Sequence, residues 1–257
     1  MTNSHALDGA DAPVFELPDG WCDIVGCGRM GEALASALSE AGVAVRGPLG
    51  RGADGDGAAM VMLCVPDREI AAASVALRPG SIVGHVSASA ELSLLEPHER
   101  FVLHPLLSVV GTGARFSGVT CAVDGSTPRA NGVARALASR LGMHVKVVRS
   151  DQRPLYHAAA SVASNFLVTL EGMAEQLAGR VGLDRTALVP LVRATVEHWA
   201  RLGAKAALTG PIARGDDVTV TRQREAVAAA APEFLPLWDA LADATLALAL
   251  APNDGHR

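Results

Sequence analysis

The chain has 257 residues, of which 49% are hydrophobic and 4% aromatic, and its formal net charge is -5 at pH 7. This length allows one or two domains with a substantial buried core. The acidic balance gives no electrostatic basis for binding nucleic acid. No apolar run is long enough to span a bilayer, since the Leu/Ala-rich stretch at 244–250 is too short.

The N-terminal residues 1–19 are polar and without periodicity, which predicts a flexible tail and does not resemble a signal peptide. The cysteines show no metal-ligand spacing, so we expect free, buried thiols and no metal. Free thiols are typical of a reducing compartment, and a cytoplasmic protein is expected. The cysteines are Cys22, Cys27, Cys64 and Cys121.

The most informative segment is a glycine-rich turn between a predicted strand at 22–25 and a predicted helix at 29–41. Its pattern, Gly-x-Gly-x-x-Gly, is that of a dinucleotide-binding turn in the required strand–turn–helix context. The first glycine permits the tight turn, the second lets a pyrophosphate approach the backbone, and the third lets the helix pack on its strand. The turn therefore predicts cofactor contacts from Gly26, Cys27, Gly28, Arg29, Met30 and Gly31.

Strands and helices alternate after this turn. We predict strands at 43–46, 58–65, 81–86, 100–103, 118–123 and 144–149, helices at 68–77 and 129–141, and a loop at 47–57. The apolar run at 58–65 suits a parallel strand covered on both faces. The order predicts an α/β fold, with a Rossmann-type doubly wound sheet over residues 20–150.

The pattern changes after Ser150. Helical periodicity occupies about 154–180, 184–203, 217–230 and 233–249, and Val218–Val220 is the one β-prone exception. Asp184 can cap the second of these helices, and Pro190 should kink it or shift its start. We therefore predict an all-helical domain over residues 151–257.

The residues that follow the second strand indicate which nicotinamide cofactor is used. Arg46 ends the predicted strand and Arg51 follows, where an acidic residue would otherwise bind the ribose of NAD. Arginine pairs well with phosphate, so NADP is preferred over NAD; the alternative is a solvated basic loop. Val65, Pro66 and Ser87 end the next strands and are predicted beside the nicotinamide or substrate, although Ser87 is equally a candidate turn residue.

Two histidines are candidate proton donors, because imidazole titrates near neutral pH. His104 ends a strand, and the alternative is that it only caps that strand. His157 shares a predicted helix face with Ser161 and Ser164 at i, i+4 and i+7, with Asn165 at its edge. This polar stripe is either a catalytic site or a hydrogen-bonded core seam.

A Pro/Gly-containing loop at 208–216 joins two late helices. Thr209 and Arg214 are its polar candidates for substrate binding, and a guanidinium can hold a carboxylate in bidentate fashion. The alternative is an interhelical turn with an exposed arginine.

Four of these motifs together resemble the Rossmann-like proteins that carry domain of unknown function 2520. They are Gly-x-Gly-x-x-Gly at 26–31, His-Pro-Leu at 104–106, Tyr-His-x-Ala with Ser-Asn at 156–165, and Ala-Leu-Thr-Gly-Pro-x-x-Arg-Gly-Asp at 207–216. More distantly, the chain is similar to pyrroline-5-carboxylate reductase, ketopantoate reductase and the phosphogluconate and hydroxyacid dehydrogenases. The resemblance implies a homodimer formed through the helical domain and a link to ketopantoate reduction.

The chain departs from these relatives at two places. The segment between the second and third strands lacks the usual helix, and His157 stands where the hydroxyacid dehydrogenases have a catalytic lysine. The leading hypothesis is an NADP-dependent reductase of a small carboxylate-bearing ketone such as ketopantoate. In it, His157 or His104 donates the proton, Asn165 and Ser161 orient the carbonyl, and Arg214 binds the carboxylate. The alternatives are a reductase of a cyclic imine such as pyrroline-5-carboxylate, and a non-catalytic NADP sensor.

Overall fold

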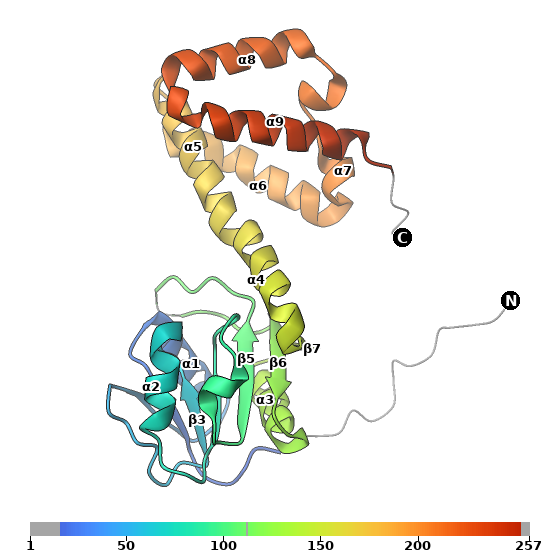
Figure 1. Cartoon of the computed structure of the whole chain (residues 1–257). Helices are drawn as coiled ribbons and strands as arrows, with labels where there is room; N and C mark the ends of the chain where they lie inside the picture. Colours follow the sequence, from blue (N-terminus) through green and yellow to red (C-terminus); the bar gives the residue numbers. More distant parts are fainter. Residues whose placement is uncertain (1–15, 112, 253–257) are drawn as a thin grey trace, which may run out of the picture. The chain divides into compact units, whose positions relative to one another are not determined.

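The structure is a computed structural model that describes residues 16–111 and 113–252 (Figure 1). Most of the predicted tail, residues 1–15, lies outside the described residues. Within the rest of it, Leu17 packs against the core. The chain divides into two compact units between Ser164 and Asn165.

The first unit contains a seven-stranded sheet in the order β2-β1-β3-β4-β5-β6-β7. The pairs among β1 to β5 are parallel, β6 is antiparallel to β5, and β7 is parallel to β6. The strand order changes direction between β1 and β3, and ligands of such sheets bind outside the carboxyl ends of the strands at this point. The predicted doubly wound sheet is confirmed. The strands are β1 (Cys22–Val25), β2 (Val45–Leu49), β3 (Met60–Leu63), β4 (Ile82–His85), β5 (Arg100–Pro105), β6 (Thr120–Gly125) and β7 (His144–Val147).

Helices cover both faces of the sheet because its central strands are apolar on both sides. All four residues of β3 are buried, as expected for a parallel strand inside a doubly wound sheet. On one face, α1 (Arg29–Glu40) and α3 (Pro128–Arg140) complete one hydrophobic cluster. On the other face, α2 (Asp67–Val75) and the short helix η1 (Leu92–Leu95) complete a second.

The second strand differs from its predicted bounds. We expected it at 43–46 and a loop from residue 47, but β2 begins at Val45 and runs to Leu49. Its register with β1 is irregular between Asp23 and Val25, which extends the pairing past the Gly-Pro sequence at 47–48. The expected absence of a helix between β2 and β3 is confirmed for this fully described segment.

The first unit also includes α4 (Arg153–Ser161), which follows the turn η2 (Ser150–Gln152). The buried Arg153 ties α4 to the sheet unit, because its guanidinium donates to the carbonyl of Ala90 at 2.8 Å and to Asp124 at 3.1 Å. The division therefore falls later than the composition change at Ser150 suggested. After α4 the backbone forms a π-helical turn, η3 (Val162–Phe166), and α5 follows.

The described part of the second unit, residues 165–252, is helical and contains no strand. Asp184 caps α6 by accepting from the backbone N–H of Thr186 at 2.9 Å, and α6 continues through Pro190. The β-prone Val218–Val220 lies inside α8. Among the described residues, no helix combines the length and apolar character that crossing a membrane requires. The main helices are α5 (Leu167–Gly179), α6 (Arg185–Leu202), α7 (Ala204–Ala207), α8 (Asp217–Ala230) and α9 (Leu235–Leu250).

Candidate functional site

The three glycines of the turn after β1 have different structural roles. Gly26 has a φ of 124°, and a Cβ on it would collide with the carbonyl of Cys64. A Cβ on Gly31 would collide with the carbonyl of Gly26, so this glycine permits close packing of α1 on the turn. A Cβ on Gly28 would meet nothing within 4 Å, and Gly28 is the N-cap of α1 without a side-chain cap. The fold therefore needs Gly26 and Gly31, whereas Gly28 leaves open space where a pyrophosphate would approach a helix N-terminus.

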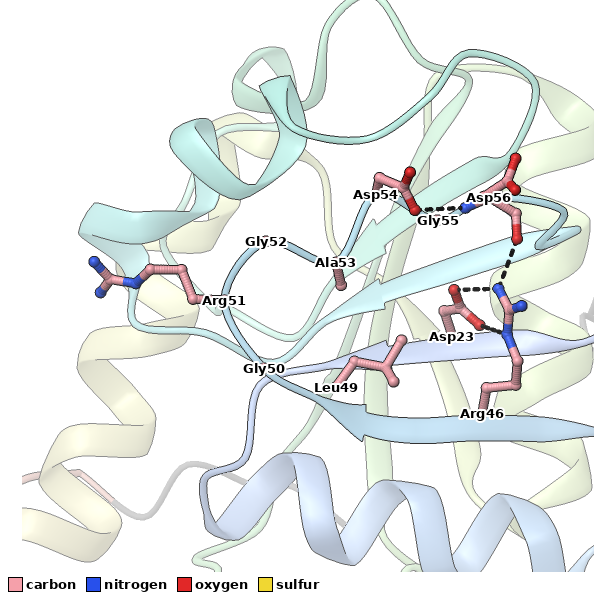
Figure 2. A pocket seen from close by; sticks show the side chains of 10 residues that line it. All are labelled: Asp23, Arg46, Leu49, Gly50, Arg51, Gly52, Ala53, Asp54, Gly55 and Asp56. Carbon is pink, nitrogen blue, oxygen red and sulfur yellow. Dashed lines mark hydrogen bonds and ion pairs between the residues drawn. The ribbon is translucent and has the colours of Figure 1, made fainter.

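A hollow of about 500 Å³ lies beside the end of β2, where the usual helix is missing (Figure 2). Arg46 lines it, but its guanidinium donates to both carboxylate oxygens of Asp23, at 2.6 and 2.7 Å, and to the carbonyl of Asp56 at 2.8 Å. Asp23 is only 1% exposed, and Arg46 also lies 4.5 Å from the ring centroid of Trp21. The hydrogen bonds that Arg46 donates to Asp23 hold the pKa of Arg46 above its usual value.

The prediction that Arg46 ends its strand is therefore wrong. Arg46 pairs with Asp23 in the β1–β2 register, and the strand continues to Leu49. The irregular register explains the error, because the Gly-Pro sequence after Arg46 reads as the start of a loop. Arg46 neutralises a buried carboxylate that would otherwise be costly to desolvate.

Arg51, the second arginine predicted to bind the cofactor phosphate, follows the end of β2 and lies about 20 residues beyond the last glycine of the turn. Its side chain is 91% exposed, and its nearest carboxylate, on Glu69, is 3.6 Å away. In Figure 2, Arg46 is directed toward Asp23 and Asp56, whereas Arg51 lies at the other end of the hollow and points away from it.

The segments that follow β3 and β4 meet through hydrogen bonds. Pro66 and Ser87 lie in these segments, just beyond strands that end earlier than predicted, at Leu63 and His85. The hydroxyl of Ser87 donates to Asp67 at 2.8 Å and accepts from the backbone N–H of Ala90 at 3.0 Å. Ser89 donates to the same Asp67 oxygen at 2.9 Å. The Ser87 hydroxyl is thus part of the turn, and the exposed carboxylate of Asp67 is the polar group at this edge.

His104 and His157 are brought together, and both are close to Tyr156. The Nδ1 of His104 is 2.9 Å from the phenol oxygen of Tyr156, and the rings meet edge to face at 88°. The pKa of His104 is lowered to about 4, mainly by burial and to a smaller extent by the charge of His157, while Asp67 opposes the shift. The expectation that His104 titrates near neutral pH is wrong, because its partly buried ring resists a positive charge. His157 is exposed on α4.

His85, at the end of β4, is a buried histidine that interacts electrostatically with His104. Its Nδ1 accepts from the backbone N–H of Ser87 at 3.2 Å, and its Nε2 is buried without a hydrogen-bond partner. Burial lowers the pKa of His85 to about 4, Arg153 and His104 add to the shift, and Asp67 opposes it. His85 is therefore a neutral imidazole at physiological pH.

The predicted polar stripe on one continuous helix is wrong beyond Ser161. The π-helical turn at 162–166 contains Ser164, so the i, i+4, i+7 spacing from His157 no longer defines one α-helical face. Asn165 begins the second unit, which also contains Thr209 and Arg214. Thr209 and Arg214 are exposed there.

Sequence reasoning gave no chemical role to Asp23, Asp67, His85 or Tyr156. One signal was available for Tyr156, which is the only tyrosine of the chain and precedes His157 in a motif. Cys27 is exposed, contrary to expectation, whereas Cys22, Cys64 and Cys121 are buried free thiols as predicted.

Solved structures with the same fold include NADP-dependent enzymes. Protein BF3122 of Bacteroides fragilis, described as a candidate NADP oxidoreductase, has a TM-score of 0.76 and 20% identity, covering 89% of this chain and 98% of that one. Protein TM1727 of Thermotoga maritima has a TM-score of 0.69 and 21% identity, with 89% and 98% covered. Pyrroline carboxylate reductase of Plasmodium falciparum, solved with NADP bound, has a TM-score of 0.57 and 10% identity, with 91% and 100% covered. At these identities the likeness shows the fold.

One family model matches a large part of the chain. Residues 119–245 match the family described as Domain of unknown function (DUF2520). The match includes the motifs at 156–165 and 207–216 and confirms the resemblance that they carry. A search of curated proteins gave no match.

Proposed function

We propose that the protein is an NADP-dependent reductase of a small carboxylate-bearing ketone, with ketopantoate as the first substrate to test. The observation that carries the proposal is the open space at Gly28, the N-cap of α1. The same unit contains the His104–Tyr156 pair, with His104 near the carboxyl end of β5 and Tyr156 on α4. A dinucleotide cradle and a group able to move a proton are the two requirements of carbonyl reduction.

The residues present fit a nicotinamide dinucleotide. Gly28 leaves room for the pyrophosphate, and Cys27, Arg29 and Met30 of the same turn are proposed to contact it. Arg51 is exposed beyond the end of β2 and is proposed to bind the 2′-phosphate. When bound, the reduced nicotinamide supplies a hydride to the carbonyl carbon. Val65 and Pro66, at the end of β3, are proposed to lie beside its ring.

Substrate recognition is assigned to residues of the α4–α5 segment and the loop before α8. Arg214 is proposed to bind the substrate carboxylate, with Thr209 as a second polar contact. Ser161, Ser164 and Asn165 are proposed to orient the carbonyl. Replacement of Arg214 by methionine should then raise KM for the acid with little change in kcat.

A substrate panel tests the reductase activity. NADPH oxidation is followed with ketopantoate, other small 2-keto acids and pyrroline-5-carboxylate. Turnover of a keto acid supports the proposal, and turnover of the imine alone replaces the ketone with the runner-up substrate class. NADPH binding without turnover on any compound refutes the reductase and supports a non-catalytic nucleotide sensor.

The cofactor assignment is tested through Arg51. Titration should show tighter binding of NADPH than of NADH. The variant Arg51→Met should weaken NADPH binding about 10-fold or more, as expected for the loss of a hydrogen bond to a charged group, and leave NADH binding unchanged. Equal affinities of the wild-type protein for both cofactors would refute the NADP preference.

A further inference from the structure

The phenol of Tyr156 pairs with His104 near the carboxyl end of β5, in surroundings that keep the phenol neutral. The two residues are 52 positions apart in the chain, and their polar atoms lie 2.9 Å from each other. Tyr156 is on α4, the helix that Arg153 ties to the sheet through Ala90 and Asp124. The pair is therefore set by tertiary structure, and both partners belong to the same compact unit.

Charged groups on two helices act on His104. His157 on α4 lowers its pKa, whereas Asp67 at the start of α2 raises it. Their effects are smaller than that of burial, which lowers the pKa of His104 to about 4. The pKa of Tyr156 is raised to about 12, mainly by burial and to a smaller extent by Cys121 on β6. Neither group carries a charge near neutral pH.

We propose that the phenol of Tyr156 is the proton donor of the reduction and that His104 is the residue that orients and reprotonates it. The proposal rests on the reductase function proposed above. It replaces His157, one of the two donors considered from the sequence, because the phenol of Tyr156 has a fixed partner in the structure. His104 is a positioning residue in this scheme, and Tyr156 is the group that touches the substrate oxygen.

The proton transfer balances as follows. Reduction of the carbonyl carbon leaves the former C=O π pair on oxygen as an alkoxide. The O–H bond of Tyr156 breaks and its proton forms the new alcohol O–H bond. The Nδ1–H of His104 then passes its proton to the phenolate, while Nε2 takes one from water. The ring returns to the Nδ1–H form by tautomerisation, so one proton from solvent enters for each hydride.

This scheme requires that His104 carries its proton on Nδ1 in the resting protein, because the phenol oxygen must accept from the ring to keep its own proton for the substrate. The tautomer can be read from the side-chain nitrogen signals of the ¹⁵N-histidine-labelled protein, with His104→Gln used to assign them. An Nδ1–H ring at pH 7 is expected. An Nε2–H ring would make the phenol donate to His104 and would overturn the proposal.

The single tyrosine gives a second measurement that does not depend on turnover. Tyrosinate absorbance reports Tyr156 alone, because the chain has one tyrosine. Its ionisation should be displaced upward toward a pKa of about 12. Ionisation near the ordinary pKa of about 10 would show a solvated phenol and would contradict the pairing.

Kinetics separate the three candidate donors. With the panel compound that the wild-type protein reduces fastest, Tyr156→Phe should lower kcat by about 100-fold or more, with NADPH affinity unchanged. His104→Gln should lower kcat with KM little changed, and His157→Asn should cost far less than either. Leu155→Ala, which removes a 79% exposed side chain from the same helix, is the matched control. Thermal unfolding of each variant shows that it is folded.

The pH dependence of kcat/KM distinguishes a proton donor from a residue with a purely structural role, because a structural role would not change it. A donor that stays neutral predicts constant kcat/KM from about pH 6 to about pH 9, whereas a histidinium donor predicts a tenfold fall per pH unit above its pKa. A wild-type profile that falls above about pH 6.5 and flattens in His157→Asn would overturn the proposal, as would full activity of Tyr156→Phe. Absence of turnover by the wild-type protein on every compound refutes the reductase itself, and the donor with it.

Discussion

The buried His85 should make the first unit sensitive to mild acid. Its side chain is 0% exposed, and burial lowers its pKa from 6.5 to about 4. In the unfolded chain the imidazole binds a proton near pH 6.5, so between these values the unfolded state holds more protons than the folded state. Stability is therefore complete above pH 6.5, falls as the pH is lowered through this window, and levels off below about pH 4.

The size of the effect follows from the shift. One pKa unit corresponds to about 1.4 kcal/mol, so His85 alone should cost about 2 kcal/mol of unfolding free energy by pH 5 and about 3 kcal/mol by pH 4. The variant His85→Asn removes this titration, and its amide oxygen can still accept from the backbone N–H of Ser87. The variant also loses packing contacts, which lowers its unfolding free energy by the same amount at every pH. Comparing the change in unfolding free energy between two pH values removes this constant difference.

The assay is urea unfolding followed by circular dichroism at pH 8, 7, 6 and 5, a range in which most carboxylates remain ionised. The wild-type protein should lose about 2 kcal/mol more than His85→Asn between pH 7 and pH 5. Between pH 8 and pH 7 both proteins should behave alike, which serves as the internal control. Equal losses in both proteins down to pH 5 would refute the assignment of a neutral, buried His85.

Three further predictions concern the cofactor domain and the assembly. Arg46→Met leaves the buried Asp23 without its partner, so the thermal unfolding midpoint of the variant should fall by several degrees. The ratio of NADPH affinity to NADH affinity should stay that of the wild-type protein. A changed ratio at constant stability would identify Arg46 as the phosphate ligand. Gly31→Ala should impair folding because the new methyl group meets the Gly26 carbonyl, whereas Gly28→Ala should fold normally and bind both cofactors more weakly in calorimetry. A homodimer is expected by light scattering, because the described part of the second unit buries few apolar side chains and exposes many large ones; a monomeric mass at micromolar concentration would count against it.

The local pattern of the chain was sufficient to predict the architecture. Alternating apolar strands and amphipathic helices, with the turn at 26–31, determine a doubly wound sheet followed by helices, because these signals depend on residues close in sequence. The same holds for the cap at Asp184 and for the placement of Pro66 and Ser87 just after two parallel strands. Each of these features depends on residues that are only a few positions apart in the sequence.

Tertiary structure decided the chemistry of the side chains. Arg46 and Arg51 look alike in sequence, and only the β1–β2 register shows that one neutralises the buried Asp23 while the other is exposed. Likewise, no local signal pairs His104 with Tyr156, which lies 52 residues away. Such pairs depend on strand register and on the position at which a helix packs on the sheet. The charge states of the paired groups depend on burial. The sequence alone determined where the candidate groups lie along the chain, and the fold decided which of them meet and which are charged.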